Sequence, residues 1–233
     1  MTSYRLPPTL SLLVLLIASS GCHTKNQMQT ETKDASTPCV VGNDYFPPAG
    51  NSETGSLHFG VDQADWESNY LKHLGEHSLY ACGSANAEPE YRFLWDRSLS
   101  EPIAVRMVVH PDGSGTLFVR MLKNGGLLPP TAPGKKEMTW DEWLKIKIDN
   151  RIDLTSEQVQ HALNLFSQIE FRAGTVKTPG ETTDGSDWIF ESRVANRYKL
   201  VDFRNEPSKA ARQFGLYMVL ELGKVPIPAD AIY

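Results

Sequence analysis

The sequence predicts an α+β domain in which a mostly antiparallel sheet carries about three helices packed on one face. A pair of alternating segments joined by a turn occurs twice, at 103–122 and 187–204, and a segment of helical periodicity follows each pair. A further helical segment precedes the first strand. Strands joined by short turns pair antiparallel, and the helices that follow can cover one face of the resulting sheet.

The first helix is expected at 62–74, because Trp66, Tyr70 and Leu74 recur every fourth residue and therefore share one helical face. A strand is expected at 91–96, where aromatic side chains alternate with Arg, Leu and Asp.

The first hairpin is expected to join 103–110 to 116–122 through a turn of Pro, Asp, Gly, Ser and Gly. The segment 123–136 is rich in Gly and Pro, which indicates a long loop. It carries the adjacent apolar residues Leu127 and Leu128. Leucines on a polar loop must be covered by the domain's own core or by a partner, and we interpret them as partner-binding residues.

The second helix is expected to begin with a capping box of Thr155 and Gln158 and to run to about residue 169. The second hairpin is expected to pair 187–192 with 198–204.

The third helix is expected to begin at Pro207 and Ser208 and to end at Gly223. Five residues at helical spacing would form its buried stripe: Ala211, Phe214, Met218, Val219 and Leu222.

The N-terminal segment 1–21 has the order of a secretory signal peptide. Arg5 precedes an apolar run at 10–18, and Ser, Ser and Gly then lead to Cys22. The run is about nine residues, whereas a helix that crosses a bilayer needs roughly 20. The segment is therefore expected to be removed.

The residues before Cys22 resemble the lipobox of bacterial lipoproteins, although Ser19 stands where that motif usually has leucine. The resemblance implies lipidation of Cys22, with diacylglycerol on its sulfur and a further acyl chain, such as palmitate, on its amine. Several acyl chains would make membrane attachment effectively permanent. The alternative is an ordinary secretory signal followed by an incidental cysteine. His23 follows the cysteine where an aspartate would retain a lipoprotein at the inner membrane, which favours the outer membrane, facing the periplasm.

The three cysteines are consistent with export. If Cys22 carries lipid, Cys39 and Cys82 remain as a pair in an oxidising compartment, which predicts a disulfide between them; two free thiols are the alternative. The polar segment 22–38 has no hydrophobic period and is interpreted as a tether, and 39–233 as a single domain.

The charge argues against nucleic acid as a partner. The chain has 23 Lys and Arg against 28 Asp and Glu, with a sequence pI of about 5.7. No basic run is present that would attract phosphate.

His73, Glu76 and His77 spell H-x-x-E-H, the pattern of inverted zinc metallopeptidases. Gly75 weakens the helix that would present these side chains, and no third ligand is evident, so they are weak metal candidates and we expect no metal and no cofactor.

No nucleophile elbow, phosphate loop, dinucleotide fingerprint or C-x-x-C is present. Asp184, Asp187 and Glu191 lie around Trp188 and could form an acid and base pair. Alternation favours the reading that they are solvated or salt-bridged surface carboxylates.

Several segments together resemble a family of uncharacterised proteobacterial exported proteins. They are WESNYLKHLGEHSL from Trp66, YRFLWDRSLSEPIAVR from Tyr91, the DGSGTL turn, DGSDWIFE from Asp184 and the ending VPIPADAIY. The resemblance covers residues 66–233 and implies a common fold. It carries no activity or catalytic residue to this chain.

We therefore expect a lipid-anchored protein of the Gram-negative envelope whose domain binds another envelope protein without catalysis, as an inhibitor or immunity factor would. A hydrolase with an unrecognised site and a purely structural lipoprotein are the alternatives.

Overall fold

The computed structural model describes residues 45–47, 61–82, 87–97, 100–124, 138–171, 185–205 and 207–232. All of them belong to the compact unit formed by Pro38–Tyr233. The α-helices are α1 (Val61–His73), α2 (Trp140–Trp143), α3 (Ser156–Ser167) and α4 (Lys209–Leu216). The strands are β1 (Glu90–Arg97), β2 (Ile103–Val109), β3 (Gly115–Lys123), β4 (Lys145–Leu154), β5 (Ser186–Val194) and β6 (Arg197–Arg204).

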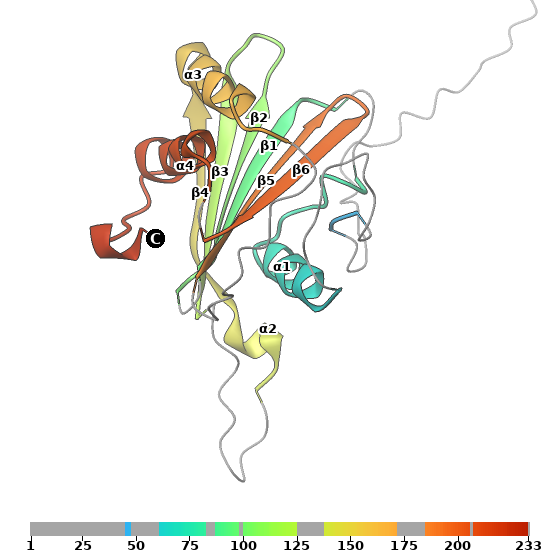
Figure 1. The fold of residues 1–233 in the computed structure, drawn as a ribbon, viewed down its shortest axis with the longest axis vertical. Helices are drawn as coiled ribbons and strands as arrows, with labels where there is room; N and C mark the ends of the chain where they lie inside the picture. The colour runs from blue at the N-terminus through green and yellow to red at the C-terminus, as the bar shows by residue number, and fades with distance from the viewer. Residues whose placement is uncertain are drawn as a thin grey trace, which may run out of the picture. The chain divides into compact units, whose positions relative to one another are not determined.

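The six strands form one antiparallel sheet in the order β4-β3-β2-β1-β5-β6 (Figure 1). The predicted α+β class with a mostly antiparallel sheet is confirmed. Both predicted hairpins are present, as β2–β3 and β5–β6. In the first turn Gly113 has a φ of 84°, a conformation that glycine adopts without strain.

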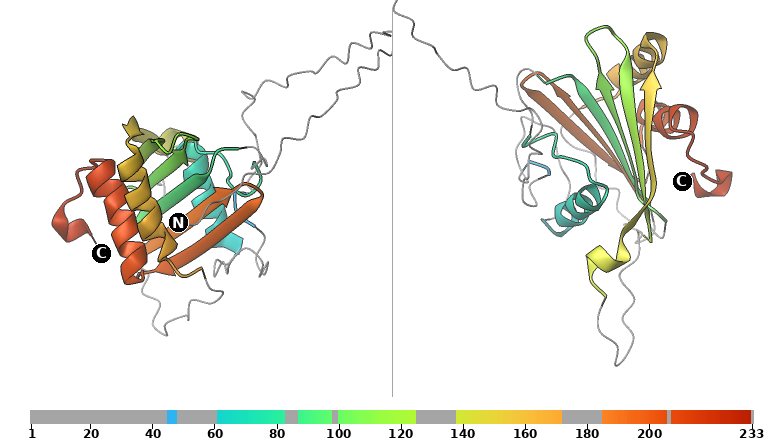
Figure 2. Two further views of the ribbon diagram at one scale, coloured as in Figure 1. Left: turned by 90° about the horizontal axis from the view of Figure 1, so that it is seen from above. Right: turned by 180° about the vertical axis from the view of Figure 1, so that it is seen from behind.

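The two C-terminal helical segments and α3 cover one face of the sheet (Figure 2). Thr155 caps α3 in a capping box with Gln158, as predicted. Ser208 caps α4, which continues into the π-helix η1 (Tyr217–Leu222) and ends at Gly223. All five residues of the expected stripe are buried: Ala211, Phe214, Met218, Val219 and Leu222.

The expectation that all helices pack on one face is wrong for α1. This helix lies on the opposite face of the sheet (Figures 1 and 2). Tyr70 of α1 and Leu74, which follows the helix, belong there to a second core together with Leu94 and Ile189. The central strands β1 and β5 carry apolar side chains at both alternating sets of positions, so both faces must be covered.

The edge strand β4 and the turn of helix α2 before it were not predicted from the sequence. Ile148 and Ile152 of β4 pack against the first core, which lies between the sheet and helices α3 and α4, while most other side chains of β4 are exposed. Such a half-exposed edge strand has a weak hydrophobic pattern. A short 3-10 helix, η2 (Ala229–Ala231), follows near the C-terminus.

Candidate functional site

Two buried groups of ionisable side chains lie on the sheet face that α1 covers. The pairing of the two central strands positions both groups, because Arg92 of β1 is opposite Glu191 of β5, and Asp96 is opposite Asp187. Leu94 and Ile189, which are paired and fully buried, lie between the two groups along the strands.

Glu76, which follows α1 and is buried, is the centre of the first group, here called the arginine–glutamate network. Arg106 Nε donates a hydrogen bond to Glu76 Oε2 at 2.7 Å, and Arg120 Nη1 donates one to Oε1 at 2.9 Å. Arg92 Nη1 lies 3.6 Å from Oε2. Burial alone would raise the pKa of Glu76, but the attraction of Arg106, Arg92 and Arg120 outweighs it and lowers the pKa.

Arg92 extends the network across the sheet. Its Nε donates to Glu191 Oε2 at 2.6 Å, and its Nη1 donates to the carbonyl oxygen of His77 at 2.6 Å. Tyr198 donates its hydroxyl proton to Glu191 Oε1 at 2.8 Å. The named oxygens of Glu76 and Glu191 accept hydrogen bonds, and Arg92 Nη2, which has no hydrogen bond of its own, lies 2.6 Å from Glu191 Oε2. The buried charges are therefore paired, and the network attaches the segment after α1 to the central strands.

The H-x-x-E-H residues do not converge. His73 Nε2 lies 2.8 Å from Asp141 Oδ1, whereas His77 Nε2 lies 3.1 Å from Glu90 Oε1. Glu76 faces the arginines instead. Among the residues that the structure describes, these three are not grouped as potential metal ligands.

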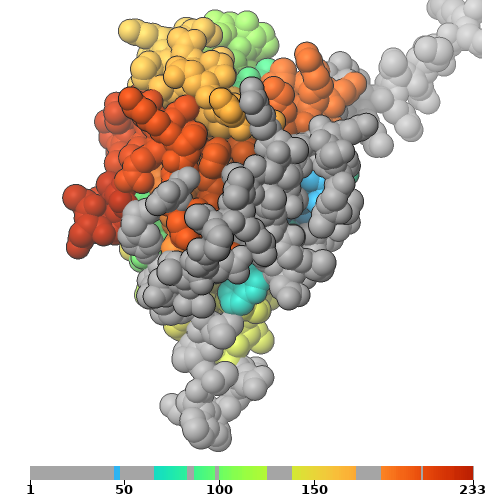
Figure 3. Space-filling view, in the orientation of Figure 1, coloured from blue at the N-terminus to red at the C-terminus, as the bar shows by residue number. Residues whose placement is uncertain are grey.

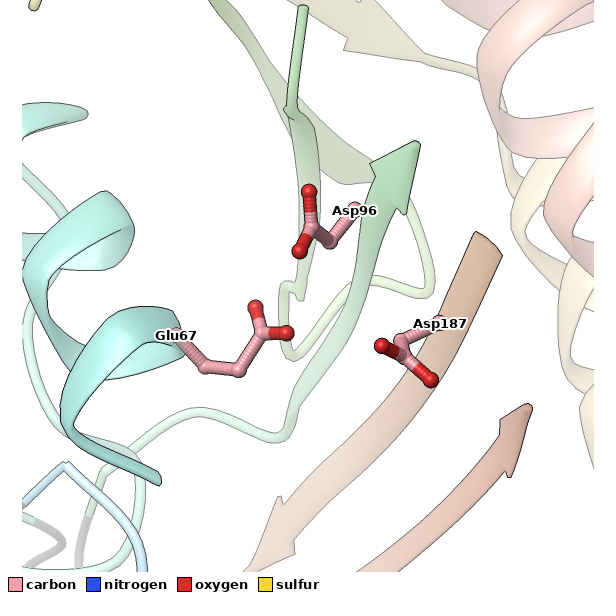
Figure 4. A group of neighbouring side chains, drawn as sticks. All are labelled: Glu67, Asp96 and Asp187. Atoms are coloured by element: carbon pink, nitrogen blue, oxygen red, sulfur yellow. The ribbon is translucent and has the colours of Figure 1, made fainter. Parts of the chain in front are cut away.

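The second group, here called the carboxylate cluster, consists of Glu67 of α1, Asp96 of β1 and Asp187 of β5 (Figure 4). One oxygen of each carboxylate lies within 4.8 Å of one oxygen of each other carboxylate. Glu67 is 1% exposed, while Asp96 and Asp187 are half-buried. Asp202 on the adjacent strand β6 is also buried.

Burial and mutual repulsion act on the protons of the carboxylate cluster. Burial raises the pKa of Glu67 well above its usual range, and Asp96, Asp187 and Asp202 raise it further. Burial and the charge of Asp187 raise the pKa of Asp96 to about 7, although a hydrogen bond from Glu67 and the charge of Arg97 lower it. Such a group favours a bound proton or a cation over free negative charge.

A pocket of about 500 Å³ lies on the other side of the sheet, between α3 and strands β1, β5 and β6. Tyr91, Leu163 and Phe166 supply its apolar wall. Its remaining lining residues are Asn164, Ser167, Ser192, Val194, Arg197 and Lys199. The described lining contains two basic residues and no acidic one, which gives the pocket a positive charge. Figure 3 shows α3 (gold) and the C-terminal helices (red) as one continuous surface.

Five of the predicted site residues lie outside the described part of the chain: Cys22, Cys39, Leu127, Leu128 and Asp184. Cys82 is disulfide-bonded, but its partner is also outside the described residues. Its pairing with Cys39 therefore stays a prediction.

The placement of Glu191 on the surface is wrong, because this side chain is fully buried under the second core. The carboxylate cluster was not predicted from the sequence either. The available signal was an acidic residue beside a tryptophan in each of two apolar strands, at Asp96 and Asp187.

No family model and no curated protein matches the chain. Among solved structures, a "putative adenylate cyclase" from Bacillus halodurans aligns with 10% sequence identity over 76% of this chain and 90% of that chain. The TM-score is 0.19, so this alignment carries no argument about fold or function. Within the described residues, no helix is long and apolar enough to span a membrane.

Proposed function

We propose that this protein is a lipoprotein of the Gram-negative envelope, anchored through Cys22, whose domain binds an acidic segment of another envelope protein. The observation that carries the binding part is the positively charged pocket beside α3. The order of signal peptide, Cys22 and polar tether supports the anchoring part. An inhibitor or immunity factor is the kind of protein that fits both parts, and the outer membrane is the expected location.

The basic side chains of the pocket can contact a partner, whereas those of the arginine–glutamate network are already paired with buried carboxylates. Arg197 and Lys199 of β6 are exposed, and no acidic side chain of the described residues forms an ion pair with either. The Lys199 ammonium lies 5.5 Å from the centre of the Phe171 ring. A ligand with a carboxylate beside an apolar side chain would match this arrangement, because charge selects the partner and the apolar wall adds affinity.

Site-specific photo-crosslinking in cells tests this proposal. A photoreactive residue replaces Asn164, which is exposed and lines the pocket. The same residue at Gln160, exposed on α3 but absent from the pocket lining, is the matched control. We expect one discrete adduct from position 164 and not from position 160.

Charge reversal then tests the role of the basic residues. Arg197→Glu with Lys199→Glu should abolish the adduct, whereas Lys209→Glu, an exposed change at the start of α4, should leave it intact. An adduct that survives the double reversal, or that forms equally from position 160, would show that the pocket is not the binding site.

A further inference from the structure

The carboxylate cluster differs from the arginine–glutamate network on the same face of the sheet. In the network, Glu76 receives hydrogen bonds from two arginines. Among the described residues, by contrast, no basic side chain forms an ion pair with Glu67 or Asp96. Three carboxylates thus lie close together beneath α1, and two of them, Glu67 and Asp96, form no ion pair with a described basic side chain.

The orientation of Glu67 adds a second, independent observation. Its side chain extends from α1 toward the two aspartates (Figure 4), and Oε2 is buried without a hydrogen-bond donor among the described residues. Asp96 Oδ1 is also buried without a hydrogen-bond donor among the described residues. Buried acceptors are nearly always satisfied in native proteins, because an unsatisfied one loses its hydration without compensation. Glu67 and Asp96 also share a side-chain hydrogen bond, but Glu67 Oε2 and Asp96 Oδ1 remain without a donor, so these two oxygens point to a further ligand.

We infer that Glu67, Asp96 and Asp187 form a binding site for a divalent cation that prefers oxygen ligands, with calcium favoured over magnesium. The donor set contains only carboxylate oxygens, and carboxylates select calcium, magnesium or manganese over zinc and copper, which prefer nitrogen or sulfur.

The number of carboxylates favours calcium. Calcium takes about 6–8 oxygen ligands in flexible geometry, whereas magnesium is usually bound through one or two carboxylates and keeps several waters. One oxygen from each of the three carboxylates lies within 4.8 Å of the others, which is close enough for one calcium ion to contact all three. Because Glu67 Oε2 and Asp96 Oδ1 are buried, the second oxygens of the carboxylates would supply further ligands through bidentate coordination.

A bound ion would join three elements that are distant in the sequence. Glu67 belongs to α1, Asp96 to β1 and Asp187 to β5, so the ion would hold α1 against the centre of the sheet. This inference is independent of the proposed partner pocket, which lies on the opposite face.

Calcium titration of the full-length chain, purified in detergent and treated with chelator, tests the site. We expect one saturable site by calorimetry, with a Kd on the order of 10⁻⁴ M or tighter, and a rise in Tm of several degrees in saturating calcium. Backbone amides of α1 should exchange more slowly with the ion bound. Magnesium at the same ionic strength should bind more weakly.

The isosteric changes Glu67→Gln and Asp187→Asn should each weaken calcium binding at least tenfold. Asp153→Asn, the same type of change at an exposed position on β4, is the matched control and should bind as the unmodified chain does. Equal calcium binding by all three variants would overturn the inference.

Calcium binding by the unmodified chain decides the case even if the variants fail to fold. The absence of a saturable site below about 10 mM calcium in the unmodified chain would overturn the metal site. If Glu67→Gln then raised the Tm, the cluster would be shown to hold a shared proton instead.

Discussion

At the scale of single residues, the effect of a buried charged side chain on stability depends on the oppositely charged side chains beside it. Glu76 is 5% exposed, and its side chain lies against Arg92, Arg106 and Arg120. Removal of one partner from such a group leaves the other charges buried without compensation, which is more destabilising than the loss of a surface ion pair.

Glu76→Gln should therefore lower the free energy of unfolding by about 3–5 kcal/mol at neutral pH. The control is Asp149→Asn, which removes another partner of Arg120 at an exposed position, where the loss should be below about 1 kcal/mol. Denaturation in urea measures both. Similar small losses for the two variants would show that the buried network contributes no more than a surface pair.

The same residue predicts a pH dependence. Because the folded-state pKa of Glu76 is lowered, its contribution to stability is present above the unfolded value, about 4.3, and is lost as the pH falls through the folded-state pKa. The groups that face it are Arg92, Arg106 and Arg120. We expect unfolding midpoints in urea to fall below about pH 4.5 more steeply for the unmodified chain than for Glu76→Gln. Parallel curves would contradict this.

At the scale of elements, turn and cap chemistry made the hairpins and α3 predictable. The capping box of Thr155 and the turn around Gly113 are local signals, and the structure confirms both. The face that α1 covers and the strand β4 were not predictable in this way, because they depend on which strands become central and which lie at the edge. The carboxylate cluster was missed for the same reason. It requires β1 to pair with β5, and the comparable contact of Arg92 with Glu191 joins residues 99 positions apart.

The contact between α4 and the sheet depends on a glycine that the helical pattern does not explain. A Cβ on Gly215 would lie 2.8 Å from Phe93 Cε1 and 3.0 Å from Trp188 Cζ3. Gly215→Ala should therefore destabilise the protein by about 1–3 kcal/mol through overpacking, although alanine is the better helix former by about 1 kcal/mol. Gln213→Ala, an exposed change in the same helix, should be near neutral. A chain stabilised by Gly215→Ala would show that the helix can move away from the two rings.

At the scale of the whole molecule, the three cysteines connect the anchor to the fold. Cys82 is disulfide-bonded, so its partner must be one of the other two cysteines, Cys22 or Cys39. A thiol that carries diacylglycerol cannot also form a disulfide. Lipidation of Cys22 and a disulfide between Cys39 and Cys82 are therefore linked predictions, and each can be tested through the other.

Two single variants separate these assignments in cells. Cys22→Ala should give unprocessed precursor without incorporation of labelled fatty acid, because alanine offers no acceptor sulfur, yet it should retain the disulfide of Cys82. Cys39→Ser should retain fatty-acid labelling and lose the disulfide, with a loss of roughly 4 kcal/mol of stability for a closed loop of about 43 residues. Mass spectrometry of non-reduced peptides and labelling with palmitate measure both outcomes. If Cys82 stays oxidised in Cys39→Ser but becomes free in Cys22→Ala, then Cys22 is the disulfide partner, and the protein cannot be anchored through that residue.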